Sequence, residues 1–286
     1  MRILTFCQCL LLAASLAAQT SLLEQARAAM QRNDPETAAN LLEKAVAQTP
    51  NNAEAHYLLG DAYGDLAQHA SIFKKPGLAK KAQAEFERAV QIDPNYLDAR
   101  FALVEYDMVA PAFIGGGEDK AIAQANEIKK RDPIEGHRAF ALIYSHQKKP
   151  DLVHKEYVDA VKEQPNSPKA RYWLGVSYLG DKNYPAASTE FETAIKIDPA
   201  YMPGWFQVGH VAALTGTNFE RGEESLRKYL AYTPAHNEPP TYRAHYWLGA
   251  ILEKQGKKAE AKASYATSLK ANPNQKDVQE AIKRVS

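Results

Sequence analysis

Cysteine is almost absent from this chain of 286 residues, because its only two, Cys7 and Cys9, lie within the first ten positions. The rest of the sequence has no thiol, which excludes disulfides, a cysteine nucleophile and cysteine-ligated zinc there. A dominant charge is also lacking, since 35 Lys and Arg face 34 Asp and Glu. Because phosphate backbones attract basic surfaces, this balance argues against nucleic acid as a partner.

Sequence motifs of metal and nucleophilic chemistry are missing as well. The eight histidines form no H-E-x-x-H pair, and neither a G-x-S-x-G elbow nor a phosphate-binding Gly-Lys-Ser/Thr motif occurs. The serines and carboxylates show no spacing that would assemble a triad or an acid–base pair. We therefore expect no catalytic residue, no metal and no cofactor.

One glycine-rich loop, with glycines at 115–117, precedes a helical pattern, where backbone N–H groups can bind an anion. Glu118 and Asp119 follow directly and would repel a phosphate. We interpret the loop as a structural insertion in which Phe113 and Ile114 pack against a neighbouring helix.

The N-terminus has one long apolar run, residues 3–16, which follows Arg2 and precedes small residues around position 17. This order is typical of a secretory signal peptide, here residues 1–18. An uncleaved membrane anchor is the alternative, but the run is shorter than the roughly 20 residues that a spanning helix needs. Neither cysteine follows a lipidation motif. We expect export to a periplasm or to the cell exterior.

Prolines recur at a nearly regular spacing, which is the most informative pattern of the chain. Each proline ends a segment in which apolar residues recur at helical spacing. The distance between successive prolines varies between 32 residues (Pro133 to Pro165) and 44 residues (Pro50 to Pro94). The full set is Pro50, Pro94, Pro133, Pro165, Pro199, Pro234 and Pro273. A repeat of this length predicts a solenoid of stacked helix pairs.

Three segments share one pattern of small and aromatic residues. The clearest has Leu174, Gly175, Tyr178, Ala187, Phe191, Ala194 and Pro199. The other two have Leu59, Gly60, Tyr63, Ala82, Phe86, Ala89 and Pro94, and Leu248, Gly249, Leu252, Ala261, Tyr265, Ser268 and Pro273. This pattern resembles the tetratricopeptide repeat. The glycines are expected where two helices approach closely, with the aromatic ring filling the remaining space.

The resemblance implies an all-α superhelical solenoid of about seven helix pairs with a C-terminal capping helix. The expected repeats cover residues 19–275, at 19–52, 53–96, 97–135, 136–167, 168–201, 202–241 and 242–275. The cap is expected at residues 276–286, where Val278, Ile282 and Val285 lie at helical spacing.

The second repeat carries an insertion at about residues 67–81 with a local basic patch of Lys74, Lys75, Lys80 and Lys81. A solvated helix face is one interpretation, and contact with an acidic partner or with lipid headgroups is the other. This insertion and the glycine loop fall in the same turn of their repeats. We expect them on the same side of the solenoid.

An aromatic stripe is the expected binding surface. In tetratricopeptide proteins the fifth position of each first helix points into the concave groove, and the alignment places there Leu23, Tyr57, Phe101, Phe140, Tyr172, Phe206 and Tyr246. Stiff aromatic side chains suit the capture of an extended peptide or a partner helix. The alternative is that these rings only pack between adjacent helices.

Together these features predict a non-catalytic adaptor or assembly scaffold in the cell envelope, which binds a protein partner along the stripe. Its partner is not identified by the sequence. A binder of a glycan or another envelope polymer is the alternative function, because aromatic rings also stack on sugars. An enzyme whose site forms at the two insertions is a third hypothesis.

Overall fold

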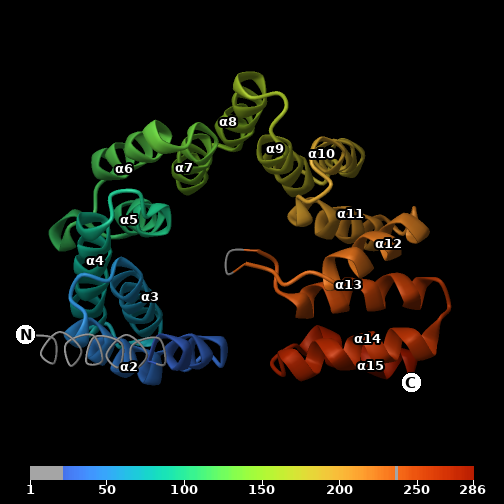
Figure 1. The fold of residues 1–286 in the computed structure, drawn as a ribbon, viewed down its shortest axis with the longest axis horizontal. Coiled ribbons are helices and arrows are strands. Elements are labelled where there is room, and N and C mark those ends of the chain that lie inside the picture. Colours follow the sequence, from blue (N-terminus) through green and yellow to red (C-terminus); the bar gives the residue numbers. More distant parts are fainter. Residues whose placement is uncertain (1–21, 236–237) are drawn as a thin grey trace, which may run out of the picture. The chain divides into compact units, whose positions relative to one another are not determined.

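The computed structural model describes residues 22–235 and 238–286, so the predicted signal peptide lies outside the described residues. Throughout the described ranges the regular elements are helices, without any strand (Figure 1). The chain divides into two compact units. The N-terminal unit ends at Lys149, and the C-terminal unit begins at Pro150.

The N-terminal unit starts with a helix whose described part is 22–31. The elements that follow are α2 (Pro35–Gln48), α3 (Ala53–His69), α4 (Lys75–Ile92), α5 (Leu97–Val109), the short 3₁₀ helix η1 (Ala112–Ile114), α6 (Glu118–Arg131) and α7 (Pro133–His146).

The C-terminal unit contains α8 (Pro150–Glu163), α9 (Pro168–Gly180), α10 (Tyr184–Ile197), α11 (Met202–Thr215), α12 (Phe219–Leu230), α13 (Thr241–Lys254), α14 (Lys258–Ala271) and α15 (Lys276–Val285).

Consecutive helices pack against each other in both units. In the N-terminal unit α3 packs on α4 and α5 on α6, and in the C-terminal unit α9 packs on α10, α11 on α12 and α13 on α14. The prediction of an all-α solenoid of helix pairs is therefore confirmed. Helix α15 packs on α14 and buries Val278, Ala281 and Val285, whereas its other residues are half-buried or exposed. The repeat boundaries stay a prediction.

The second helix of a repeat ends where an acidic or amide residue precedes the proline. Asp93, Asp198 and Asn272 all have extended backbones, as expected for a residue whose helical region is blocked by the following ring. Pro133 differs because it is the first residue of α7 rather than part of a longer turn. Asp132 there ends α6 and caps α7, accepting hydrogen bonds of 3.0 Å from two backbone N–H groups.

The repeated spacing of glycine and aromatic residues produces a close approach between paired helices in three repeats. A Cβ atom added at Gly60 would lie 2.5 Å from a ring carbon of Phe86. The same contact would be 2.6 Å between Gly175 and Phe191, and 2.6 Å between Gly249 and Tyr265. Real Cβ atoms do not approach carbon this closely, so the expected role of these glycines is confirmed.

A side chain six residues after the proline contacts the proline carbonyl in four repeats, and we call this contact the carbonyl clasp. The nitrogen–oxygen distances are 3.1 Å for His56 and Pro50, 2.9 Å for Arg100 and Pro94, 3.3 Å for Arg171 and Pro165, and 3.0 Å for Trp205 and Pro199. The clasp satisfies a carbonyl that the ended helix leaves without a partner.

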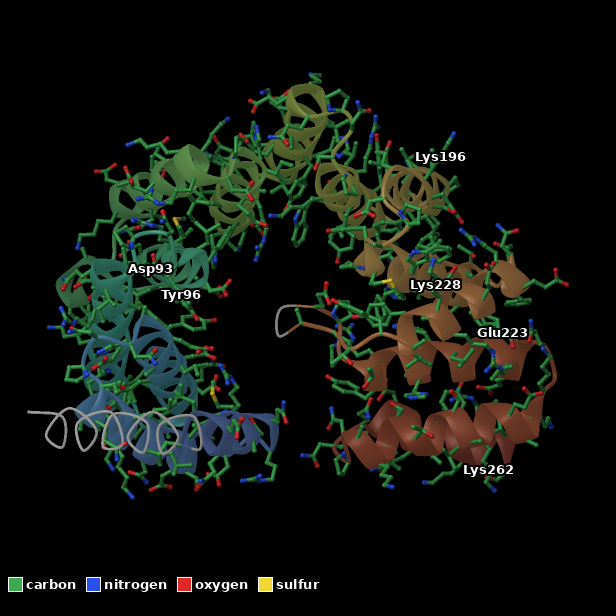
Figure 2. All side chains as sticks on the ribbon, viewed as in Figure 1. Asp93, Tyr96, Lys196, Glu223, Lys228 and Lys262 are labelled. Carbon is green, nitrogen blue, oxygen red and sulfur yellow. The ribbon has the colours of Figure 1, made fainter. Side chains whose placement is uncertain are left out.

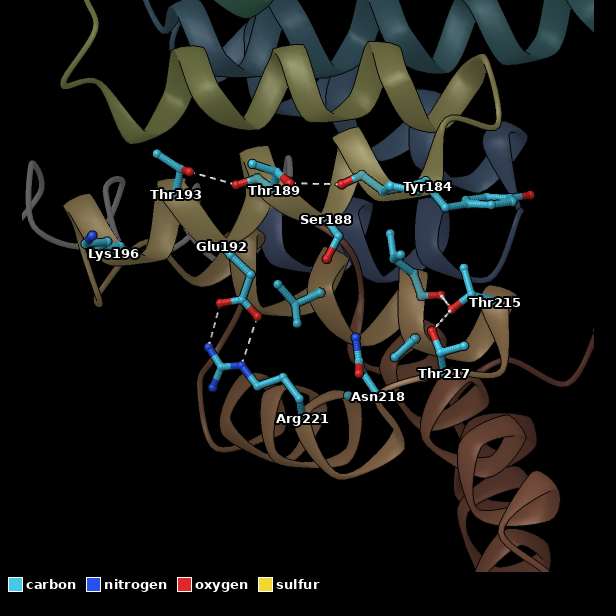
Figure 3. A pocket seen from close by; sticks show the side chains of 15 residues that line it. Tyr184, Ser188, Thr189, Glu192, Thr193, Lys196, Thr215, Thr217, Asn218 and Arg221 are labelled. Carbon is cyan, nitrogen blue, oxygen red and sulfur yellow. Dashed lines mark hydrogen bonds and ion pairs between the residues drawn. The ribbon is translucent and has the colours of Figure 1, made fainter.

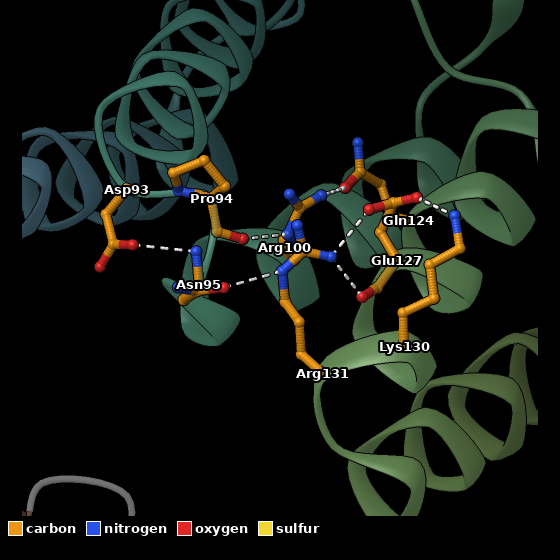
Figure 4. A network of polar contacts seen from close by, with 8 residues as sticks. All are labelled: Asp93, Pro94, Asn95, Arg100, Gln124, Glu127, Lys130 and Arg131. Atoms are coloured by element: carbon orange, nitrogen blue, oxygen red, sulfur yellow. Dashed lines mark hydrogen bonds and ion pairs between the residues drawn. The ribbon is translucent and has the colours of Figure 1, made fainter.

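The clasp also reaches the second helix of its own repeat. Arg100, which is buried, donates to Gln124 Oε1 of α6 at 2.8 Å as well as to Pro94 (Figure 4). His56 contacts Glu85 and Arg171 contacts Glu190 in the corresponding way. One side chain thus ties together the turn, the first helix and the second helix.

Replacing Gly60 with alanine tests the glycine–aromatic contact. Gly60→Ala should lower the free energy of unfolding by about 1–3 kcal/mol, because Phe86 would have to move. Gly64→Ala, one turn later in α3, meets no atom within 4 Å and should raise it by about 0.5–1 kcal/mol. Denaturant unfolding followed by circular dichroism measures both, and equal effects would contradict the packing assigned to Gly60.

Candidate functional site

The predicted aromatic stripe lies partly in the core. In the N-terminal unit Phe101 is buried, with the Arg138 guanidinium 4.1 Å from its ring centre, while Tyr57 and Phe140 are half-buried. In the C-terminal unit Phe206 is only 2 % exposed, while Tyr172 and Tyr246 are half-buried. Leu23, at the same position of the first repeat, is buried too.

The half-buried rings of the stripe contact aromatic residues on the second helix of their own repeat. Ring centres lie 6.0 Å apart for Tyr57 and Phe86, 5.9 Å for Tyr172 and Phe191, and 5.9 Å for Tyr246 and Tyr265. Such contacts stabilise the repeat in their own right. The packing interpretation therefore applies to the stripe, and its role in binding stays a prediction.

Trp247 lies beside the stripe and is a residue that the sequence analysis did not identify. Trp247 follows Tyr246 in α13, and its ring centre lies 4.3 Å from that of His210. Burial, and next Arg243, lower the pKa of His210 to about 4, so this imidazole is neutral at neutral pH. The Trp247 indole N–H is buried and has no acceptor within the described part of the chain. An unpaired buried donor of this kind costs free energy of folding.

The two insertions meet at one apolar pocket of the N-terminal unit, which we call the insertion pocket. Its volume is ≈ 620 Å³, within the range of about 300–1,000 Å³ that ligand sites occupy. Helices α3, α4, α5 and η1 supply its walls, which include Ile72, Phe86, Tyr106 and Ile114. The prediction that both insertions lie on the same side is confirmed by this shared lining.

The packing expected for Phe113 is wrong. Its side chain lines the edge of the insertion pocket but is 78 % exposed, because no neighbouring helix covers it there. Ile114 is half-buried and lines the pocket, as expected.

The glycine loop is fixed by its own hydrogen bonds. The N–H groups of its three glycines donate to the carbonyls of Ala112, Pro111 and Asp107 at 3.0, 3.3 and 2.9 Å. The Tyr106 hydroxyl donates to the Ile114 carbonyl at 2.6 Å. Because its glycine N–H groups are already occupied, the loop does not offer them to a phosphate.

A second groove lies in the C-terminal unit between α10, α11 and α12, with a volume of ≈ 860 Å³. The Arg221 guanidinium reaches across it to Glu192 with two contacts of 2.9 Å (Figure 3). Ser188, Thr189 and Thr193 line one side. The Thr189 and Thr193 hydroxyls donate to backbone carbonyls of α10, so the threonine side chains stabilise the helix itself.

Among the described residues there is no group of three or more potential metal-ligating side chains. No helix within the same ranges is long and apolar enough to cross a membrane.

Three repeat-family models match separate parts of the chain. A TPR repeat model matches residues 26–66, and two tetratricopeptide repeat models match residues 147–201 and 242–275. These matches agree with the packed helix pairs and with the glycine–aromatic contacts. The chain is a tetratricopeptide-repeat protein. No curated protein matches it closely enough in sequence to count as a relative.

Solved structures with the same repeat architecture resemble this tetratricopeptide-repeat protein at low identity. A tetratricopeptide repeat protein from Parabacteroides merdae is 16% identical, with a TM-score of 0.49 over 94% of this chain and 99% of that one. Yeast Tom70 is 14% identical, with a TM-score of 0.56 over 88% of this chain and 58% of its own. The APC/C Cut9–Hcn1 hetero-tetramer is 14% identical, with a TM-score of 0.53 over 91% of this chain and 48% of that one. The chain thus spans about half the length of these last two, and the likeness shows the fold alone.

One buried carboxylate of the tetratricopeptide-repeat protein lies next to the glycine loop. Asp107 in α5 is 5 % exposed, and its Oδ1 has no hydrogen-bond partner among the described residues. Burial raises the pKa of this carboxyl to about 6, with Lys120 opposing the rise and Glu87 adding to it. No pattern in the sequence distinguishes this residue from a surface aspartate.

Asp107→Asn is expected to stabilise the protein in a pH-dependent way. The folded chain holds the Asp107 proton up to about pH 6, whereas an unfolded aspartate loses it near 3.8. The stabilising contribution is therefore present below pH 3.8 and is lost as the pH rises through about 6. At about pH 7 the variant should be more stable by about 1–2 kcal/mol, and at about pH 4 nearly equal to the natural protein.

Denaturant unfolding at the two pH values measures this difference. Glu105→Gln, on an exposed position of the same helix, is the matched control and should show no comparable pH dependence. A constant difference between Asp107→Asn and the natural protein across the range would contradict the assignment.

Proposed function

We propose that this protein is a non-catalytic adaptor or assembly scaffold of the cell envelope, which binds a peptide or a helix of a protein partner along the aromatic stripe. The apolar run at residues 3–16 supports export, since it has the length and order of a secretory signal. Tetratricopeptide repeats are generally non-catalytic interaction modules, which supports the absence of an enzymatic role.

The observation that carries the proposal is the surface around Tyr172 and Tyr246 in the C-terminal unit. The Tyr172 ring contacts the rings of Trp173 and Tyr201, whose centres lie 5.1 and 5.8 Å away, and all three residues are half-buried. Such side chains are already held in place, so a partner would lose little entropy in ordering them. Tyr and Trp are also the residues that dominate binding energy at protein interfaces.

A polar contact accompanies these rings. The Tyr172 hydroxyl accepts a hydrogen bond of 3.4 Å from the Gln207 amide, which is long enough to be exchanged for a better partner. This contact favours a ligand that has polar groups beside apolar side chains, as a peptide has.

A glycan in place of the peptide is less well supported by the geometry. Sugars stack on an open aromatic face, but the faces of Tyr57, Tyr172 and Tyr246 are in tilted contact with aromatic rings of the same repeat. Their edges and hydroxyls are what remains for a ligand.

A photo-crosslinking residue at Tyr172 should trap one defined protein in the native cells. The control is the same residue at Lys262, an exposed position on α14 of the same unit (Figure 2). The trapped protein, once purified, should bind a Tyr172→Ala variant about tenfold more weakly or worse. Circular dichroism checks that this variant stays helical.

Trapping at Lys262 as strong as at Tyr172 would contradict the stripe as the binding surface. Release of the trapped material by glycosidases rather than by proteases would favour the glycan instead.

A further inference from the structure

We infer that the insertion pocket is a second interaction surface, which takes an amphipathic helix of a protein partner. The helix would place its apolar face in the pocket, an acidic residue toward Lys74 and Lys75, and a basic residue toward Asp61 and Glu105. The proposed function rests on stripe residues of the C-terminal unit, whereas this surface lies in the N-terminal unit and goes beyond that function. One ring of the pocket, Phe86, is also the ring that the stripe residue Tyr57 contacts.

Exposed apolar side chains gather at this pocket. Of the five large hydrophobic residues that are exposed in the described chain, four lie in or next to the two insertions: Ile72 at 79 %, Phe73 at 93 %, Val109 at 66 % and Phe113 at 78 %. The fifth, Leu214, is 39 % exposed in the C-terminal unit. Single exposed apolar residues need no explanation, but Ile72, Val109 and Phe113 all line this one pocket, and such a concentration marks an interaction surface.

The pocket is concave and is held in shape before any partner binds. Its floor includes Phe86, Ala82 and Ala102, and Ile72, Val109 and Phe113 are among its rim residues. The loop on the Phe113 side is fixed by the hydrogen bonds of Tyr106 and of the glycines, and the Lys120 ammonium donates to the Gly115 carbonyl at 2.6 Å. A preformed pocket reduces the entropy cost of binding.

Positive charge lies where α4 begins. Lys74 is the N-cap of this helix and Lys75 its first residue, and both are exposed and without an ion-pair partner in the described structure. The first turn of α4 has no acidic residue, and no side chain caps it. The helix dipole therefore adds to the two ammonium groups, and together they favour a carboxylate on the partner.

Negative charge lies toward the other end of the pocket. Asp61 lines it from a point eight residues before the end of α3, which is roughly 12 Å along that helix. Glu105 lines it four residues before the end of α5. The pocket thus has lysines at the start of α4 and carboxylates on α3 and α5, eight and four residues before the ends of those helices.

This arrangement favours a helix over a membrane surface. Roughly 12 Å corresponds to about eight helical residues, the span over which apolar anchors at i, i+3, i+4 and i+7 occur. A bilayer is flat and cannot fill a concave pocket, and an anionic bilayer would be repelled by Asp61 and Glu105. A helix with opposite charges at its two ends matches both ends of the pocket.

Selection from a displayed library of random peptides of about 16 residues, or roughly four helical turns, on the immobilised full chain tests this inference. The enriched peptides should share apolar anchors at helical spacing, with an acidic residue toward one end and a basic residue toward the other. Val109→Asp combined with Phe113→Asp should weaken their binding at least about tenfold. Both side chains are exposed, so the variant should stay folded.

Two further variants distinguish pocket binding from general stickiness. Leu214→Asp, at the exposed apolar residue of the C-terminal unit, is the matched control and should leave the affinity unchanged. Lys74→Glu with Lys75→Glu should invert the charge preference at one end of newly selected peptides. The stripe variant Tyr172→Ala should bind the peptides normally. A failure of the pocket inference can therefore be distinguished from a failure of the proposed function.

Three outcomes would overturn the inference. The first is a set of selected peptides without a common pattern, or peptides that bind the Val109→Asp and Phe113→Asp variant equally well. The second is sedimentation with phosphatidylglycerol vesicles that Phe73→Glu abolishes, which would identify a lipid surface. The third is a dimer in analytical ultracentrifugation that Phe113→Asp dissociates, which would identify a second copy of the chain as the occupant.

Discussion

The contact between a glycine of one helix and an aromatic ring of the next is the constraint on which the three clearest repeats depend. At Gly60, Gly175 and Gly249 the ring occupies the position that a Cβ atom would need. Because the helices come this close, the ring is enclosed: Phe191 and Tyr265 are fully buried. The same rings then support the stripe residues Tyr172 and Tyr246, so the candidate binding surface rests on the glycine contact.

The carbonyl clasp stabilises the turn between repeats, which the glycine contact between the paired helices does not include. A proline ends the second helix for local reasons, and its carbonyl is then satisfied by a side chain six residues later. Histidine, arginine and tryptophan all serve, since each presents a nitrogen at a suitable distance from the helix axis. Different residue types therefore make the same contact, which hides the clasp from a search for motifs.

Sequence patterns predicted those parts of the structure that a repeated motif marks. The glycine contacts were predicted because three segments place a glycine and an aromatic residue at corresponding positions of a helix pair. The exposure of Phe113 was not predicted, because an apolar residue is assumed to be buried unless its surroundings are known. The unpaired carboxylate of Asp107 and the unpaired indole of Trp247 depend in the same way on neighbours that are distant in sequence.

The insertion pocket arises because two helices of the second repeat are longer than their neighbours. Helix α3 has 17 residues and α4 has 18, whereas α5, which follows them, has 13. About one turn of α3 and one turn of α4 therefore extend beyond the part of the repeat that the glycine contact and α5 cover. Ile72 and Phe73 lie beyond that level, and the glycine loop brings Phe113 to the same rim. Helix extension thus leaves the packing of the repeat intact while it exposes apolar surface, so a new interaction surface can be added without disturbing the core.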